Sequence, residues 1–282
     1  MKFLEENQFI IVKDHSVSKE TFSLLYNKEY DILKTHPTPS LEVLPKYYES
    51  EDYISHTDGK RTLFEKIYHL VKRNAIKGKV SLLNKEQNSK GKLLDIGCGT
   101  GDFLVEAKNQ GWSILGFEPN SDAKQLAAKK GVLFTEDIFA LPENTFDVVS
   151  MWHVLEHVPN LTEYIANLKR IVKPNGTIII AVPNYKSYDA KYYNRFWAAY
   201  DVPRHLWHFS KTSIKRLFSD VDMELKKEKP MWFDSFYVSL LSEKYKNGKM
   251  SFVKGFLVGL RSNVSGLFKK EFSSHIYIIK NK

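Results

Sequence analysis

A glycine-rich turn lies near the middle of the chain, in the run DIGCGTGDFL that begins at Asp95. Glycines allow a sharp backbone turn and a close ligand approach, because no Cβ stands in the way. The polar and apolar residues that follow predict a helix, whose first turn presents free backbone N–H groups. The glycines are spaced GxGxG, whereas the dinucleotide fingerprint is GxGxxG. The turn therefore predicts a nucleotide-like ligand that need not be a dinucleotide.

Two carboxylates follow the turn at the intervals expected of a nucleoside site. Glu118 ends the next apolar stretch, in GFEPN, where an acid can accept hydrogen bonds from both ribose hydroxyls. Asp137 stands beside Ile138 after a third stretch, and this pair suits the exocyclic amine and the face of an adenine. The three features together favour an adenosine-containing ligand.

Short apolar runs alternate with amphipathic segments around these residues, which predicts parallel βαβ units and a doubly wound sheet. The predicted strands cover 93–96, 113–119, 132–137, 146–152 and 177–183, and the predicted helices cover 102–109, 122–130 and 161–172. A helix over 211–219, a strand near 223–228 and a final strand in SSHIYIIK complete the pattern.

These residues resemble the class I S-adenosylmethionine-dependent methyltransferases, most strongly over 92–183. The resemblance implies an α/β, Rossmann-like, seven-stranded and mostly parallel sheet, with an antiparallel last strand and helices on both faces. It implies that three glycines line the methionine moiety, Glu118 holds the ribose, Asp137 and Ile138 the adenine, and His153 lies near the methionine end. The implied cofactor-binding residues are Asp95, Gly97, Cys98, Gly99, Gly101, Phe117, Glu118, Pro119, Asp137, Ile138 and His153.

The segment MWHVLEHVPN, over 151–160, resembles the small-molecule branch of that family, which includes ubiquinone-biosynthesis O-methyltransferases. An Asn/Asp-Pro-Pro-aromatic motif of amino-methylating nucleic-acid enzymes is absent there. We therefore expect a small or lipid-like acceptor methylated at oxygen. His153, Glu156 and His157 do not have HExxH zinc spacing, and we predict no metal. Glu156 and His157 are expected to face the acceptor or to cap the next helix.

Histidines supply the candidate general bases. Methyl transfer is an in-line displacement on an activated sulfonium, so the enzyme mainly aligns the acceptor and removes its proton. Histidine suits proton removal because its pKa lies near neutrality. His205, in YDVPRHLWHFS, is our first candidate, followed by His153 and His157, with His208 behind them. Arg204 is a candidate partner for an anionic acceptor group, while Ser210 is read as a helix N-cap.

The chain divides in the sequence into an N-terminal cap or lid over 1–85 and a methyltransferase domain over 86–282, with an insertion at about 235–272. An aromatic cluster that includes Tyr47, Tyr48, Tyr53 and His56 either closes over the cofactor or packs as core. Cys98 is the one cysteine, so no disulfide framework or cysteine zinc site forms, and a reducing cytoplasmic location is expected.

The formal net charge is +9, and the excess gathers toward the C-terminus. Segment 251–270 has apolar residues at helical spacing with Lys and Arg among them. Lid or core packing is favoured for this segment over weak contact with an anionic membrane surface. No strong nucleic-acid signal is present, and the sequence does not set the oligomeric state.

Three other functions remain open on the sequence. A same-fold alternative is methylation of rRNA or protein, which the basic tail favours mildly. A nicotinamide-dependent oxidoreductase is disfavoured by the early third glycine. The third is a catalytically inactive regulator that binds the cofactor.

Overall fold

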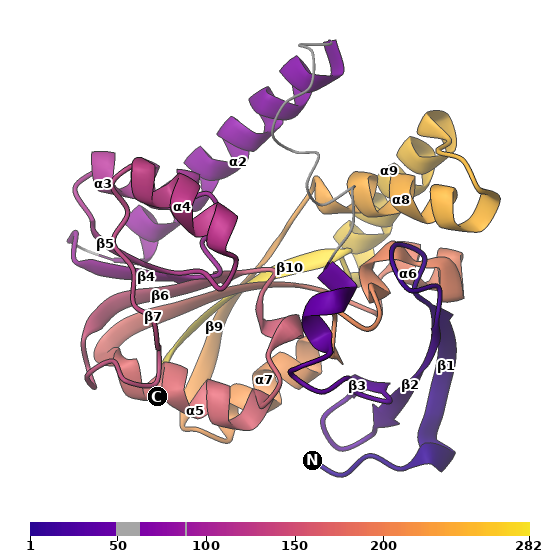
Figure 1. Ribbon diagram of the computed structural model, residues 1–282, viewed down its shortest axis with the longest axis horizontal. Helices are drawn as coiled ribbons and strands as arrows, with labels where there is room; N and C mark the ends of the chain where they lie inside the picture. Colours follow the sequence, from indigo (N-terminus) through magenta and orange to yellow (C-terminus); the bar gives the residue numbers. More distant parts are fainter. Residues whose placement is uncertain (49–62, 88) are drawn as a thin grey trace.

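The computed structural model describes residues 1–48, 63–87 and 89–282, and its centre is a twisted six-stranded sheet (Figure 1). The β10 strand runs antiparallel to both of its neighbours, as predicted for the last strand, while β5, β4, β6 and β7 are parallel. The strands in spatial order are β5 (Ser113–Phe117), β4 (Lys92–Ile96), β6 (Phe146–Trp152), β7 (Val172–Pro183), β10 (Ser274–Asn281) and β9 (Met223–Pro230).

Helices cover both faces of this sheet, which confirms the predicted Rossmann-like α/β class (Figure 1). Central strands such as β4 are buried on both faces, which explains their continuous apolar runs. One face carries α2 (Leu63–Glu86), α3 (Asp102–Asn109) and α4 (Ser121–Lys129). The other face carries α5 (Leu161–Ile171) and α7 (Lys211–Ser219). Ser210 caps α7 in a capping box with Ser213, as the sequence indicated.

The prediction of seven strands was wrong, because the stretch 132–137 does not form one. Phe134 makes a single parallel bridge to Gly116, at the outer edge of β5. Two side chains then bond to local backbone: Thr135 Oγ1 donates to the Asp137 carbonyl at 2.9 Å, and Asp137 Oδ1 accepts from Phe139 N at 2.7 Å. Such local bonds turn the backbone and compete with a strand ladder.

The N-terminal residues form a second, antiparallel sheet that also takes in a strand from far along the chain. Its order is β1 (Gln8–Lys13), β2 (Thr21–Asn27), β3 (Ile32–His36) and β8 (Trp207–His208). The helix α2, by contrast, packs against α3 in the large sheet's helical layer. The predicted boundary at residue 85, between an N-terminal cap and a methyltransferase domain, stays a prediction. By its contacts, α2 belongs with the helices that cover the large sheet. Residues 207–208 belong with the N-terminal sheet.

A helical hairpin between β9 and β10 occupies the predicted insertion. It consists of α8 (Asp234–Asn247) and α9 (Phe252–Lys269). The remaining elements are short: α6 (Tyr188–Tyr193), η1 (Glu5–Asn7), η2 (Leu44–Tyr48), η3 (Leu155–His157), η4 (Asn194–Phe196) and η5 (Ala198–Tyr200). None of the helices in the described part of the chain combines the length and the hydrophobicity that a membrane span requires.

A buried guanidinium joins the N-terminal sheet to the segment that follows β7. Arg204 Nη2 lies 3.0 Å from Asp14 Oδ1 and 2.6 Å from Asp201 Oδ1, and its Nη1 donates to the Tyr47 carbonyl at 2.8 Å. Although burial alone would raise the pKa of Asp14, Arg204 and backbone N–H groups hold it well below its usual range. Arg204 is thus satisfied within the protein, and it is not available for the acceptor contact considered from the sequence.

Replacing Arg204 by Ala should lower the free energy of unfolding by about 3–5 kcal/mol at pH 7, because Asp14 is left buried without its cation. Since the pKa of Asp14 is lowered in the fold, this deficit should shrink as the pH falls below about 4. Urea denaturation at several pH values measures it.

The matched control is Arg216→Ala, which removes a half-exposed ion pair to Glu29 and should cost less than about 1 kcal/mol. Equal losses for the two variants would show that the Arg204 cluster does not anchor the fold.

Candidate functional site

The glycine turn after β4 uses left-handed backbone at each of its three glycines, with φ of 71° at Gly97, 54° at Gly99 and 76° at Gly101. A Cβ at Gly97 would clash with the Val154 side chain, and one at Gly101 would lie 2.8 Å from Ala127 Cβ. A Cβ at Gly99 would meet nothing within 4 Å. Gly97 and Gly101 therefore permit protein packing, whereas Gly99 borders open space.

Glu118 at the end of β5 is tied to this turn. Its Oε2 accepts a hydrogen bond from Gly99 N at 2.7 Å, and its Oε1 accepts one from Asn120 N at 2.9 Å. The Phe117 carbonyl accepts from Gly97 N at 2.8 Å and from Cys98 N at 3.2 Å. The predicted glycine, Phe117 and Glu118 positions therefore form one cradle, and Pro119 follows them at its exposed rim.

Two predicted cofactor residues lie under the cradle rather than on its surface. Asp95 is 2% exposed and accepts a hydrogen bond from Ser150 Oγ at 2.6 Å. Burial raises the pKa of Asp95 to about 7, against the opposing effects of Ser150 and Lys79. Burial likewise raises the pKa of the Cys98 thiol to about 12. The thiol therefore stays protonated at neutral pH and serves in packing, because only the thiolate is a nucleophile.

The predicted adenine residues differ from one another in exposure. Asp137 is exposed, and its carboxylate accepts from Phe139 N at the turn described above. Ile138 is buried in the core between the sheet and α5, so its side chain does not line open space. Phe139 is exposed, with its ring 5.9 Å from that of Tyr164. The structure thus offers Phe139 as a surface ring beside Asp137 that sequence reasoning did not select.

His153 follows β6 and lies between two carboxylates. Its Nε2 is 3.0 Å from Asp234 Oδ2, and its Nδ1 is 3.4 Å from Glu156 Oε1. Burial works against protonation, yet Asp234 and Glu156 raise the pKa of His153 to about 10. His153 is therefore an imidazolium at neutral pH and has no lone pair with which to accept a proton, which argues against its role as general base.

Glu156, His157 and His205 come together although they arise from two distant segments. One side-chain ligand atom from each lies within 4.8 Å of the others. The His157 Nδ1 is 2.9 Å from the Arg204 carbonyl, and the His205 Nδ1 is 2.9 Å from the Ala199 carbonyl. Because a carbonyl only accepts, each Nδ1 carries the hydrogen and leaves Nε2 as the lone-pair nitrogen. The cluster can accept a proton, or could hold a divalent cation.

Glu156 is the anionic member of this cluster. It is 1% exposed, and neither carboxylate oxygen has a hydrogen-bond partner among the described residues. Burial alone would raise its pKa, but the neighbouring histidines, above all His153, lower it. The His153 imidazolium, 3.4 Å from Oε1, balances part of this charge, and the carboxylate oxygens can still accept a hydrogen bond or bind a cation.

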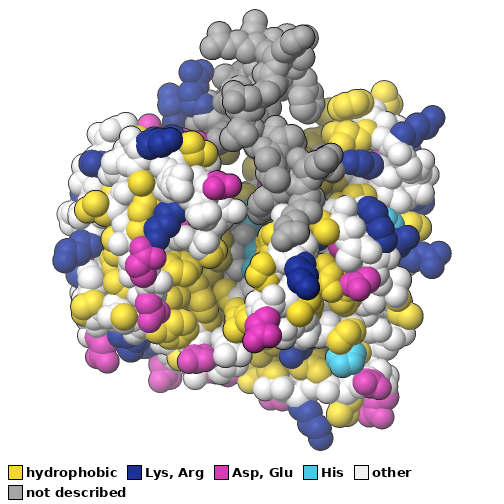
Figure 2. Space-filling model, in the orientation of Figure 1, with side chains coloured by type: hydrophobic (Ala, Val, Ile, Leu, Met, Phe, Trp, Pro, Cys, Tyr) yellow, Lys and Arg dark blue, Asp and Glu magenta, His cyan; other side chains and the backbone are white. Residues whose placement is uncertain are grey.

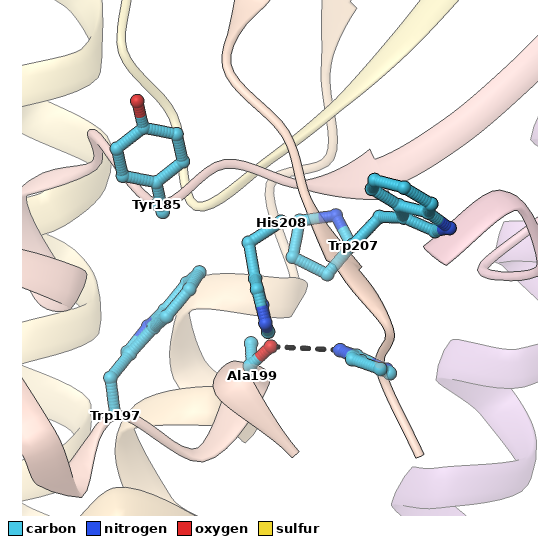
Figure 3. Close-up of a pocket in the computed structure, with 7 residues that line it drawn as sticks. Tyr185, Trp197, Ala199, Trp207 and His208 are labelled. Atoms are coloured by element: carbon cyan, nitrogen blue, oxygen red, sulfur yellow. Dashed lines mark hydrogen bonds between the residues drawn. The ribbon is translucent and has the colours of Figure 1, made fainter. Parts of the chain in front are cut away.

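His205 itself is closely packed. Figure 3 shows the aromatic side chains Trp197, Trp207 and His208 around the Ala199 carbonyl that bonds it. The space they enclose leaves no room for a water molecule. Burial and the nearby His157 lower the pKa of His205 to about 4, so it is neutral at pH 7. His157 is half-buried, so it is the more accessible member of the pair.

The short helix η2, which follows β3 of the N-terminal sheet, contributes one aromatic residue to this cluster. Tyr48 Oη lies 3.0 Å from His157 Nδ1. Tyr47 donates its hydroxyl to Glu20 Oε2 at 2.6 Å and packs on Phe22 within the N-terminal sheet. Of the aromatic cluster predicted to form a lid or core, Tyr53 and His56 lie outside the described residues.

A cavity of about 340 Å³ opens on the α2 side of the sheet, next to the β6 end that carries His153. Trp152, Met231, Trp232 and Ile276 are among its apolar walls, and Lys79 and Lys229 are among its polar ones. Lys79 Nζ lies 4.3 Å from the centroid of the Trp152 ring. The cavity can take an apolar molecule with an anionic or polar group.

Asp234 is the functional candidate that the sequence did not indicate. It begins α8, about eighty residues after His153, and no motif surrounds it. Its contact with His153 arises only because the hairpin folds back onto the carboxyl edge of the sheet.

The ionisation of His153 provides a direct test of this arrangement. In NMR titrations the imidazole of His153 should show a pKa of about 10, and Asp234→Asn should lower that pKa because it removes the carboxylate at Nε2. Asp122→Asn, at an exposed position in α4, is the control that should leave it unchanged. A His153 that titrates near 6.5 in the unaltered protein would contradict the assignment.

Comparison with known families gives a match over the region just described. A family model for a methyltransferase domain matches residues 62–228, more than half of the chain. The chain is also 28% identical, over 192 residues, to the ubiquinone biosynthesis O-methyltransferase of Rickettsia typhi, which covers 63% of this chain and 77% of that protein.

Solved structures agree with the fold. Magnesium protoporphyrin IX methyltransferase from Synechocystis PCC 6803, with bound S-adenosylhomocysteine, has a TM-score of 0.57 at 13% identity, covering 86% of this chain and all of that one. Geranyl diphosphate C-methyltransferase from Streptomyces coelicolor has a TM-score of 0.55 at 14% identity, covering 82% and 86%. At such identities the likeness concerns the fold alone.

Proposed function

The chain belongs to this methyltransferase family and is an S-adenosylmethionine-dependent enzyme, and we propose that it methylates a small, lipid-like acceptor at oxygen. The observation that carries the proposal is the largely apolar cavity beside the β6 end, which suits a small hydrophobic molecule better than a nucleic acid or protein. The name of the Rickettsia relative supports an oxygen acceptor. Family membership excludes the nicotinamide-dependent alternative.

In this proposal the cofactor lies across the cradle at the ends of β4, β5 and β6. Glu118 holds the ribose, Gly99 gives the methionine portion close access, and Asp137 lies toward the adenine. Asp95 and Cys98 support the turn from below. His153, Glu156 and Asp234 carry one positive and two negative charges, and their net negative charge complements a sulfonium.

Gly99→Ala should weaken the binding of S-adenosylmethionine about tenfold or more, because its methyl group would project into the ligand space. Gly248→Ala is the matched control: it also has positive φ and open space around a Cβ, but it ends α8 away from the cradle. Isothermal calorimetry measures both affinities, and thermal unfolding checks that both variants fold.

Similar dissociation constants for the two glycine variants would contradict the proposed position of the cofactor. In that case backbone strain, which both substitutions introduce at a positive φ, would account for the change in each variant, and contact with the cofactor would not.

For the chemical step, we propose that the acceptor hydroxyl gives its proton to the His157–His205 pair. A ring nitrogen of each histidine lies within 4.8 Å of a Glu156 carboxylate oxygen, and this carboxylate stabilises the imidazolium that forms. His157 is the accessible base, and His205 is the neutral, packed partner behind it. The oxygen then attacks the sulfonium methyl carbon, the carbon–sulfur bond breaks, and S-adenosylhomocysteine leaves.

His157→Ala should lower kcat about a hundredfold or more and leave cofactor affinity unchanged, because it removes the base and not the cradle. His36→Ala, at a half-exposed histidine of β3, should leave kcat within twofold of the unaltered enzyme. Turnover with a phenolic or hydroquinone acceptor measures both. An unimpaired His157→Ala enzyme would contradict the base.

The same three side chains favour a second role, because two histidines and a carboxylate are a common set for divalent cations. If the cluster holds a cation, it would orient the acceptor oxygen and lower its pKa. A general-base mechanism predicts turnover that EDTA does not affect, whereas loss with EDTA and recovery with Mn²⁺ or Zn²⁺ would identify the metal-assisted mechanism.

A further inference from the structure

The helix α9 has its large apolar side chains on the outside. Val253, Leu257 and Phe268 are 74%, 57% and 82% exposed. The complete set of exposed apolar residues on this helix is Phe252, Val253, Phe256, Leu257, Leu260, Val264, Leu267 and Phe268. They recur at helical spacing and form one continuous stripe, here called the outer stripe.

The inner face of α9 explains why these residues point outward. Its buried residues are Gly255, Val258, Gly259, Ser262, Asn263 and Gly266, most of them small. A Cβ at Gly255 would lie 3.0 Å from Leu240 Cα, and one at Gly259 would lie 2.9 Å from Phe236 Cα. The GxxxG pair therefore brings α9 against the α8 backbone. Core packing of 251–270, which the sequence favoured, is made by the small residues. The side chains of the outer stripe stay 44–82% exposed, although the Phe256 ring stacks on Phe236 of α8.

Positive charge accompanies this stripe. Between Leu240 and Lys282 the sequence has nine basic residues and two acidic ones, Glu243 and Glu271. Lys254 Nζ lies 3.6 Å from the buried Glu243 Oε1, so the cations outnumber the acids but one of them is paired. By helical spacing, Lys254 and Arg261 border the outer stripe along one edge, and Lys269 and Lys270 follow at its end. Figure 2 shows hydrophobic side chains beside Lys and Arg at the upper right, where Figure 1 places the α8–α9 hairpin.

We propose that the outer stripe docks the protein onto an anionic membrane surface, with α9 lying in the plane of the interface. An exposed apolar stripe bordered by cations is the pattern of helices that bury one face among acyl chains and neutralise lipid headgroups. A second copy of the chain fits less well, because two such faces would bring their positive charges together. The α9 helix is not a membrane span.

The hairpin also connects this surface with the proposed acceptor cavity. Trp232 and Phe233, which line the cavity, immediately precede α8, and Phe236 one turn later stacks on Phe256 of α9 at 5.2 Å. Docking through the outer stripe would thus bring the cavity close to the source of a lipid-like acceptor. This connection rests on the proposed function, whereas the docking itself does not.

Sedimentation of the full chain with vesicles tests the docking. Binding to vesicles of phosphatidylglycerol and phosphatidylcholine should exceed binding to phosphatidylcholine alone about tenfold, and salt should weaken it. The variant V253S/L257S/F268S should bind anionic vesicles at least about tenfold more weakly than the unaltered chain, because three inserting groups are lost. The matched control I11S/F9S/L41S alters three exposed apolar residues elsewhere and should bind normally.

Two further measurements separate the outcomes. Affinity for S-adenosylmethionine should be the same in both triple variants, which verifies folding and keeps this test independent of the proposed function. Equal vesicle binding by the two variants, or no binding by the unaltered chain, would overturn the proposal. A dimer that becomes a monomer only in V253S/L257S/F268S would assign the stripe to self-association and would also overturn it.

Discussion

The buried guanidinium of Arg204 is the interaction on which the geometry of the histidine cluster depends. It ties Asp14 in the N-terminal sheet, Asp201 in the segment after β7 and the Tyr47 carbonyl to one point. The neighbours of these groups are the residues of the site. His205 follows Arg204, Tyr48 follows Tyr47, and the Arg204 carbonyl orients His157. A desolvated cation with fixed partners can hold such remote segments in register because breaking any one contact leaves a buried charge.

A second electrostatic chain links the carboxyl edge of the large sheet to the helical hairpin. His153 bridges Asp234 at the start of α8 and Glu156 after β6, and its high pKa keeps it charged. Glu156 in turn faces His157 and His205. The start of α8 is therefore linked to the cluster by a chain of charges that passes through one imidazolium.

The hairpin shows how small residues can reverse the usual orientation of an amphipathic helix. Burial of large side chains normally decides which face of a helix turns inward. In α9 the close approach allowed by Gly255 and Gly259 replaces that contribution by backbone packing against α8. The Phe, Leu and Val side chains then remain outside, so the apolar periodicity of the sequence marks a surface rather than a core.

The sequence by itself determined the fold class, the cofactor family and the bounds of several elements, such as α3 and α7, because strand and helix periodicities and the GxGxG turn are local patterns. The sequence wrongly predicted a strand over 132–137. Thr135 and Asp137 bond to nearby backbone there, and this competition with a strand ladder depends on side-chain geometry. Only the tertiary structure decided the rest. The pairing of His205 with His157, the charge on His153 and the outward face of α9 all depend on contacts between residues far apart in the chain, and no spacing along the sequence encodes such contacts.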